Sequence, residues 1–520
     1  MSIVAIAHKS FFVGEIFLML DSLACLVFEL RSGWALQQLT APETYGTIAY
    51  EYEKNSYPLA LADVLATNED RDEALAFLQQ LDPQATGTLG VDLHSGFVLK
   101  AQTRKYFAFG DRLDPAYRDR MFQAMDTLAD TDPLTREAQT PRRFWERSTD
   151  NCTTPVDCRN TDNLRAMRET SLYLMAEETG NTVTQQIYRD RLARYTQTLL
   201  SIGMGEWDSP TYHGHTTAAY LNLYDFAVDP EVKHIAQTAL DWLFRSAALK
   251  YWRGSWLGPA KRLGDDNAAA FFWLYFGDAP PPETLEKDWI HALTSRYRPS
   301  AEVLRLAQRN FPKPVEIRRT HPHYENWKPG LYGPAFYETL YLAHTYQLGT
   351  LAQGSAGDWT GFSLHMAQGN GTDELIVTAE DAQAIAQFNN LVLWWSDRPP
   401  TIEWPAGSRS HIDGITFVKT EGTWLAYHPF AHGFALEIGE TQSHGTFEQF
   451  QTAVLRRARL TTQSAEVTYR SSQGDRLRLR PQGNRLPDIW RNGQLHDWAT
   501  HANPDELNRL ARSPNTLTLP

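Results

Sequence analysis

Hydrophobic residues recur with a helical period along the first two thirds of the chain. From about residue 40 to 350, amphipathic segments of roughly 12 to 20 residues are separated by Gly, Pro, Asn and Asp turns. In 162–180, Leu164, Met167 and Met175 follow the i, i+3, i+4, i+7 rule, and Gly180 is suited to end that helix. The clearest predicted helices span 72–81, 116–129, 162–180, 183–203, 215–227, 230–249 and 266–277.

The pattern changes to short runs rich in β-branched and aromatic residues in the last third of the chain. The sequence "SSQGD" (471–475) between two alternating runs predicts a hairpin turn. The segment "GTLAQGSAGD" (349–358) is the predicted linker between the helical part and the strand-rich part. The predicted strands lie in 373–381, 390–397, 414–422, 423–430, 433–440 and 465–481.

Helices followed by strands predict a multidomain protein with an α domain and then an antiparallel β domain, because alternating α/β folds interleave the two. A chain of 520 residues is also too long for one compact core. We expect an N-terminal apolar segment or helix over 1–39, a helical domain over 40–350 and an antiparallel β-sandwich over 351–520.

Composition and charge narrow the class of ligand. The net charge of −13 and the absence of a long basic stripe in the sequence argue against a nucleic-acid partner, because phosphate neutralisation needs a basic footprint. The 16 tryptophans fit either the core of a large protein or the stacking of sugar rings. An anionic substrate would have to be met by local Arg, His and Asn side chains.

The N-terminus and the cysteines bear on the compartment. The apolar stretch 11–30 is interrupted by Glu15 and Asp21, which argues against a membrane-spanning helix or transmembrane anchor. It fits a buried or amphipathic first helix, or a degraded secretion signal. The cysteines of "CTTPVDC" (152–158) lack a metal-ligand or redox spacing and would close a small disulfide loop only in an oxidising compartment. A cytoplasmic location is slightly favoured over a periplasmic or secreted one.

The stretch "GEWDSPTYHGHTTAAYLNLYDFAVDP" (205–230) concentrates Tyr212, His213 and His215 at the mouth of a helix predicted to start near Thr216. His215 and Asn222 then fall on one helix face. The free N–H groups of a helix N-terminus favour a bound carboxylate. The alternative is structural: the tyrosine and His213 pack against a neighbouring tryptophan, His215 caps the helix, and Asn222 is a buried hydrogen-bonding residue.

This organisation resembles the polysaccharide lyases of the alginate lyase and heparinase II/III type. Asn163 in "RNTDNLRAMRE" matches the family's inner-helix Asn, although Leu164 follows it where some members have His. Tyr212, with His213 and His215, matches the later Tyr/His group, and "YQLGTLAQG" (346–354) is similar to the Tyr-x-Leu-Gly segment before the sandwich. The resemblance implies an incomplete α/α toroid, an antiparallel β-sandwich and a cleft where they meet.

Cleavage of a uronate polymer by β-elimination needs donors that neutralise the carboxylate, a base for the C–H proton and an acid for the leaving oxygen. We expect Tyr212 or His213 to transfer the proton and Asn163 with His215 to neutralise the carboxylate. This chemistry requires no metal and no cofactor. The predicted function is therefore lyase-like cleavage of an acidic polysaccharide, which would be the protein's partner.

A second cluster lies in "RRTHPHYENWKPGLYGPAFYETLY" (318–341), a proline-broken stretch of the kind that often carries function. Its two closest histidines lack the two further ligands that a zinc site needs, so no metal is predicted. The residues predicted to bind substrate are Asn222, Arg165, Trp207, His321, His323, Tyr324 and Trp327.

Two other functions fit the same architecture. Toroids of paired helices also carry glycoside hydrolases, whose two carboxylates flank the scissile bond. Here the candidate pairs are Glu206 with Asp208 and Asp265 with Asp266, although adjacent acids in loops are more often caps or solvated charges. The third possibility is a glycan-binding protein in which the aromatics bind and nothing reacts.

Overall fold

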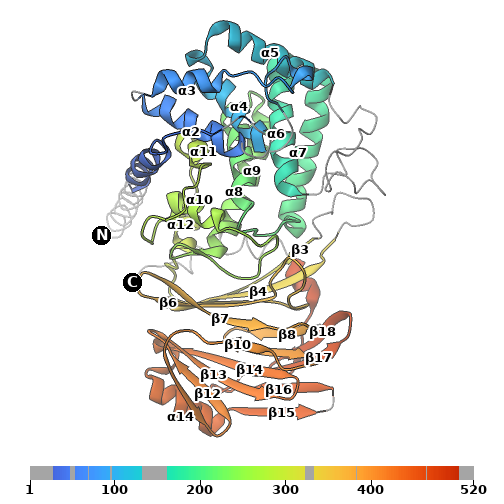
Figure 1. Cartoon of the computed structure of the whole chain (residues 1–520). Helices are drawn as coiled ribbons and strands as arrows, with labels where there is room; N and C mark the ends of the chain where they lie inside the picture. The colour runs from blue at the N-terminus through green and yellow to red at the C-terminus, as the bar shows by residue number, and fades with distance from the viewer. Residues whose placement is uncertain are drawn as a thin grey trace, which may run out of the picture.

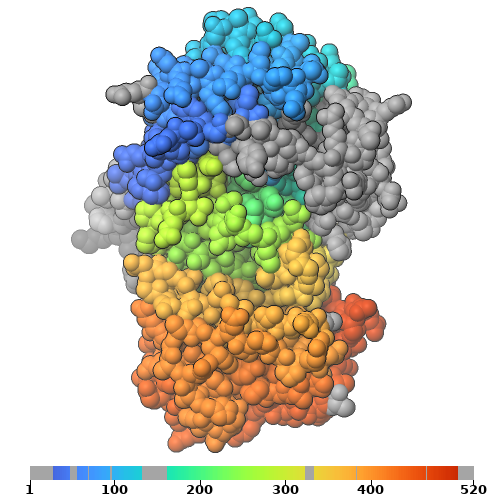
Figure 2. Space-filling view, in the orientation of Figure 1, coloured from blue at the N-terminus to red at the C-terminus, as the bar shows by residue number. Residues whose placement is uncertain are grey.

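The computed structural model describes residues 27–46, 48, 53–67, 70–93, 97–131, 161–322, 333–381, 383–463 and 465–502. Helices gather at one end of the molecule and stacked sheets at the other (Figure 1). The space-filling view shows the helical residues resting directly on the first strands along a broad junction (Figure 2). Within the described ranges, no helix combines the length and the hydropathy that crossing a membrane requires.

The helical part begins with a helix over 27–39, in which Phe28, Ala35 and Leu39 are buried. The remaining α-helices are α2 (Glu53–Ala66), α3 (Arg71–Leu78), α4 (Phe97–Phe109), α5 (Pro115–Asp130), α6 (Asp162–Thr179), α7 (Thr182–Ile202), α8 (His213–Phe226), α9 (Pro230–Lys250), α10 (Asn267–Phe276), α11 (Trp289–Thr294) and α12 (Ala301–Ala307). The long helices pair, with α6 packed on α7 and α8, and α8 packed on α9. Helix α6 is buried along most of its length and is therefore an inner helix.

The sheet part holds three antiparallel sheets. The first sheet has the order β10-β7-β6-β5-β4-β3, the middle sheet β11-β12-β13-β14-β9-β8 and the third sheet β15-β16-β17-β18-β19. The strands of the first sheet are β3 (Val315–His321), β4 (Phe336–Leu342), β5 (Tyr346–Leu351), β6 (Phe362–Gln368), β7 (Gly371–Thr378) and β10 (Thr401–Glu403). Those of the middle sheet are β8 (Gln383–Phe388), β9 (Leu391–Ser396), β11 (Ser408–Ile412), β12 (Ile415–Lys419), β13 (Thr423–Phe430) and β14 (Gly433–Glu440). Those of the third are β15 (Arg459–Gln463), β16 (Glu466–Arg470), β17 (Arg476–Gln482), β18 (Arg485–Arg491) and β19 (Gln494–Leu495).

The middle sheet is buried on both faces. Side chains such as Val392 pack toward the first sheet, while Leu393, the next residue along β9, packs toward the third. All of β14 is buried, as expected for a strand covered on both sides. Helix α14 (Phe447–Arg457), which follows the short α13 (Thr441–His444), adds Phe450 and Val454 to the core between the middle and third sheets.

The predicted fold class, paired helices followed by antiparallel sheets, is confirmed, with three stacked sheets in the β part. Most predicted helices match within a few residues because their amphipathic periods are local. The predicted hairpin turn at 471–475 joins β16 to β17, and Gly474 there has φ +102. A two-strand hairpin, β1 (Tyr251–Trp252) with β2 (Ser255–Trp256), connects α9 to α10.

The passage from helix to strand comes earlier than the sequence predicts. The strands of the three large sheets begin at Val315, and β3, β4 and β5 belong to the first sheet although the sequence predicts a helical domain as far as residue 350. The predicted linker at 349–358 begins inside β5, which is buried throughout and lies between β4 and β6. Gly349 there serves close packing and not flexibility, because a Cβ would lie 2.4 Å from Cδ of Pro259. The domain division at 39 and 350 stays a prediction.

Candidate functional site

The loop between α7 and α8 lies on the junction between the helices and the first sheet. It starts at Gly203, whose φ is +89, and a Cβ at this position would lie 2.9 Å from the carbonyl oxygen of Thr320 on β3. The glycine thus lets the loop cross the end of β3 in close contact. The loop delivers Glu206, Trp207 and Asp208 to this junction, all of them fully buried.

Tyr212 occupies the N-cap position of α8, and the helix begins at His213 instead of near Thr216. The earlier start arises because Ser209 accepts two backbone N–H groups: its hydroxyl accepts that of Tyr212 at 3.1 Å and its carbonyl accepts that of His213 at 3.2 Å. The Tyr212 side chain remains half-buried. His213, in contrast, turns into the helical core.

Arg262 reaches over the Tyr212 ring. Its guanidinium carbon lies 5.2 Å from the ring centroid, which is cation–π distance. The same side chain is 35% exposed, and its Nε lies 3.7 Å from Oε1 of Glu206. A cationic group that faces both a partly exposed phenol and solvent is suited to meet an anionic ligand.

Behind Arg262, two buried carboxylates meet at the start of α6. Asp162 accepts the backbone N–H of Glu206 at 2.5 Å, and Oε2 of Glu206 accepts the backbone N–H of Asn163 at 3.0 Å. Burial, followed by the nearby charge of Asp162, raises the pKa of Glu206 to about 8, so this carboxyl group is protonated at neutral pH. Among the described residues, Oδ1 of Asn163 and Oε1 of Glu206 have no hydrogen-bond partner. Both side chains are buried, Asn163 at 2% and Glu206 at 0% exposure, so these two atoms lie beneath the surface.

His215 forms a dyad with an aspartate. Its Nδ1 contacts Oδ2 of Asp288, just before α11, and the other oxygen of Asp288 pairs with Nζ of Lys100 at 2.8 Å. Burial alone would raise the pKa of Asp288, but Lys100 and His215 hold it well below its ordinary value. An ionised carboxylate only accepts, so Nδ1 of His215 carries the proton and Nε2 is left as the acceptor in the neutral ring. The rings of His215 and Tyr212 have centroids 6.2 Å apart.

Other residues predicted for the site lie inside the protein. Nε2 of His213 contacts the carbonyl oxygen of Leu243 at 3.0 Å, and burial lowers the pKa of this histidine. Asn222 accepts a hydrogen bond from Arg104 at 2.8 Å and is fully buried, in agreement with the structural alternative. Arg165 pairs with Glu169 on its own helix. These three side chains are almost entirely covered in the described structure.

Trp207 and His321 stack on each other, with ring centroids 4.7 Å apart, and both are buried. His323, Tyr324 and Trp327 lie outside the described residues. The structure therefore brings Tyr212 and His215 together at the start of α8, while Asn163 is buried beside Glu206, and Trp207 and His321 belong to the packing between the helices and the sheet.

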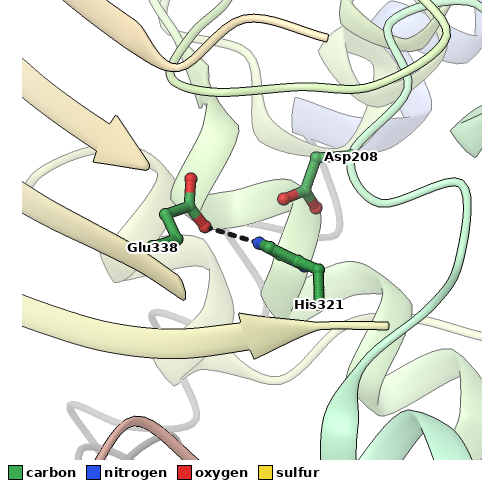
Figure 3. Close-up of side chains that lie close together, drawn as sticks. All are labelled: Asp208, His321 and Glu338. Carbon is green, nitrogen blue, oxygen red and sulfur yellow. Dashed lines mark hydrogen bonds and ion pairs between the residues drawn. The ribbon is translucent and has the colours of Figure 1, made fainter. Parts of the chain in front are cut away.

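Asp208, His321 and Glu338 offer the one group of side chains in the described ranges whose ligand atoms lie close enough for a metal, all within 4.8 Å (Figure 3). Lys250 pairs with Glu338 at 2.5 Å and with Asp208 at 3.5 Å, and Arg319 contacts both carboxylates. Two carboxylates thus face two cationic side chains, and burial lowers the pKa of His321 so that it is neutral. A metal ion would add charge to a balanced cluster, so these residues fit an ion-pair network and not a metal centre.

The carboxylate pairs considered for a glycoside hydrolase occupy different surroundings. Glu206 and Asp208 are both fully buried, and Asp208 forms ion pairs with Arg319 and Lys250. Asp265 and Asp266 are exposed just before α10. Neither pair is arranged as two carboxyl groups across an open site.

Arg262 and Asp288 are site residues that the sequence did not predict. Arg262 follows Lys261 in a polar turn before α10, and that turn's proximity to a helix mouth was the one available signal. Asp288 gave no local signal, because it is 73 residues away from His215 in the chain.

Comparison with known proteins finds likeness among solved structures, where four chains match. No family model and no curated protein matches the chain. Among solved structures, the X-ray structure of the Streptomyces coelicolor A3 chondroitin AC lyase in complex with chondroitin sulphate aligns with a TM-score of 0.33 and 9% identity, over 89% of this chain and 92% of that one. A likeness at this level shows neither a shared reaction nor shared site residues.

Proposed function

We propose that the protein cleaves an acidic, uronate-containing polysaccharide by β-elimination at the start of α8. The observation that carries the proposal is the neighbourhood of the half-buried Tyr212: its ring centroid lies 5.2 Å from the Arg262 guanidinium carbon and 6.2 Å from the ring centroid of His215, which contacts Asp288. These are the three kinds of group that the reaction needs: a proton-transfer group, a cation for the carboxylate and a second acid–base group.

In the proposed reaction, Arg262 holds the uronate carboxylate and stabilises the negative charge that develops on it. His215 takes the phenolic proton of Tyr212, the resulting phenolate removes the proton from the neighbouring carbon, the bond to the glycosidic oxygen breaks, and a double bond forms in the sugar ring. The proton then returns to the leaving oxygen from Tyr212 or His215. Because His213 is buried against Leu243, the proposal assigns the proton transfer to Tyr212.

The test measures ultraviolet absorbance of the conjugated double bond after incubation with alginate, glucuronan, heparan, pectin and chondroitin sulphate. Elimination produces this absorbance, whereas hydrolysis yields reducing ends without it and simple binding yields neither. The variant Tyr212→Phe should lose about two or more orders of magnitude in kcat with an unchanged melting temperature.

The matched control is Tyr224→Phe, because Tyr224 is also half-buried on α8 and packs edge-on against Tyr297, with centroids 5.6 Å apart. This variant should keep full activity. An active wild-type enzyme whose Tyr212→Phe variant is equally active would refute the assignment of Tyr212, and reducing ends without the double bond would replace the lyase by a hydrolase.

A further inference from the structure

The third sheet turns a row of arginines to solvent. Arg459 on β15 lies directly opposite Arg470 on β16, and Arg470 lies directly opposite Arg476 on β17. All three are exposed, and among the described residues none of their side chains pairs with a carboxylate. Neighbouring strands lie about 4.8 Å apart, so the row crosses roughly 10 Å of the sheet.

This arrangement opposes the stability of the sheet. Like charges directly opposite each other on neighbouring strands are destabilising. The chain is otherwise acidic, with a net charge of −13, yet residues 456–491 hold nine arginines against three acidic residues. A concentrated positive face on an acidic protein is complementary to an anionic ligand.

The register places further polar groups beside the row. Thr461, Thr468 and Arg478 form the next cross-strand row on this face, which continues to Trp490 on β18. The inward positions Val467, Tyr469, Leu477, Leu479 and Ile489 fill the core against the middle sheet. The face therefore combines guanidinium groups with hydroxyl groups, the donors and acceptors that a charged and hydroxyl-rich polymer requires.

The tryptophan on this face is already covered. The guanidinium carbons of Arg478 and Arg480 lie 3.8 and 5.0 Å from the Trp490 ring centroid. Glu466 accepts from both arginines at 3.3 to 3.4 Å and fixes them there. A nucleic-acid base that stacked on this ring from the arginine side would have to displace these guanidinium groups. Nucleic acids also carry denser charge, which the acidic remainder of the protein repels.

We propose that this arginine face, defined by Arg459, Arg470 and Arg476 with Thr461, Thr468 and Arg478, binds a sulfated or carboxylated polysaccharide. Figure 1 shows β15 and β16 at the end of the molecule opposite the helices, so this site is separate from Tyr212 and Arg262. The choice of a polysaccharide as the ligand rests on the proposed function. The face would hold the polymer at a second point while another stretch of it reaches the start of α8.

The experiment measures binding of the full chain to size-defined heparin and alginate oligosaccharides by titration calorimetry at several salt concentrations. All proteins carry Tyr212→Phe, so that the ligand is not consumed. The triple change Arg459→Gln, Arg470→Gln and Arg476→Gln should weaken binding by about tenfold or more and flatten its dependence on salt.

The control triple changes Arg120, Arg194 and Arg296 to Gln, because these are exposed arginines of the helical part and their loss alters the net charge equally. This control should bind like the parent protein, and both triples should keep its melting temperature. Equal weakening by both triples, or unchanged binding of the arginine-face variant, would overturn the proposal. Binding of heparin but not alginate would restrict the ligand to sulfated chains.

Two further measurements complete the test: binding of duplex DNA, which tests the class of ligand, and cleavage of the polymers, which separates this inference from the proposed function. Duplex DNA that binds more tightly than both polysaccharides at equal salt would assign the face to nucleic acid and refute the proposal. A protein that cleaves no polymer but binds polysaccharide through the arginine face would leave this inference standing and remove the lyase. If the wild type cleaves oligosaccharides and the arginine-face triple binds them as tightly as its parent, the lyase proposal stands and this inference is refuted.

Discussion

Removal of one partner from the ion-pair network between the helices and the first sheet should destabilise the protein strongly, because it leaves a buried charge without compensation. Arg319 on β3 contacts Glu338 on β4 and Asp208 on the loop before α8, and it donates to the Ser246 hydroxyl at 2.8 Å. Its side chain is 6% exposed and both carboxylates are fully covered. The change Arg319→Met keeps much of the apolar stem and removes only the charge and the donors.

The expected cost follows from the charge balance. Without Arg319, Lys250 alone faces two buried carboxylates, and breaking a buried network by removal of one partner costs about 3–5 kcal/mol. Burial alone would raise the pKa of Glu338, and Arg319 and Lys250 lower it below its ordinary value. His321 offers partial relief, because its Nε2 lies 2.9 Å from Glu338 and protonation of the ring would restore the missing positive charge.

Stability should therefore depend on pH differently in the two proteins. In the wild type, burial lowers the pKa of His321, so its neutral form contributes stability that is lost as pH falls below about 6.5, its ordinary value. In Arg319→Met, the loss of the guanidinium raises the His321 pKa. The destabilisation should be largest near pH 8 and smaller near pH 6.

The assay is urea unfolding at both pH values, followed by tryptophan fluorescence and circular dichroism. The exposed pair of Arg118 with Asp111 supplies the control, since Arg118→Met should change the free energy of unfolding by less than about 0.5 kcal/mol. Adding Glu338→Gln to Arg319→Met restores the balance and should recover about 1–2 kcal/mol. A cost below about 1 kcal/mol at both pH values, or strict additivity of the two changes, would refute the reasoning.

Three further changes test the candidate site and its supporting loop. Asp288→Asn should lower kcat by about tenfold or more on any polymer that the wild type cleaves, because the amide no longer fixes the proton on Nδ1 of His215. The acidic limb of the pH profile should also shift, and an unchanged profile would make the aspartate purely structural. Glu206→Gln should match the wild type in stability at pH 5 and exceed it at pH 9, because the buried carboxyl group has its pKa raised to about 8 and loses its stabilising contribution as pH rises through that value. Thermal melting at both pH values measures this, and a variant that is less stable than the wild type at pH 9 would contradict it. Gly203→Ala should destabilise the chain by about 1–3 kcal/mol in urea unfolding, because φ is +89 and the new methyl group would meet the Thr320 carbonyl; Gly180→Ala at φ +77, with no atom within 4 Å, isolates the backbone part of that cost.

The sequence by itself determined the helices and most of the later strands, and it showed Tyr212 and His215 close together in the chain. Amphipathic periods such as that of 162–180 are properties of neighbouring residues, and the structure forms α6 over Asp162–Thr179. The turn at 471–475 was equally local, since its Gly and Asp residues favour the turn directly. The concentration of Tyr212 and His215 at a helix start was also visible in the sequence.

Only the tertiary structure decided which partners those side chains contact. The partner of His215 lies 73 residues away, and the contact between Arg319 and Asp208 joins residues 111 positions apart. Strand β5 is a strand because β4 and β6 pair with it, while its Gly349 reads as a linker residue in the sequence. Contacts of this kind depend on which elements pack together, a global free-energy minimum that no local pattern encodes.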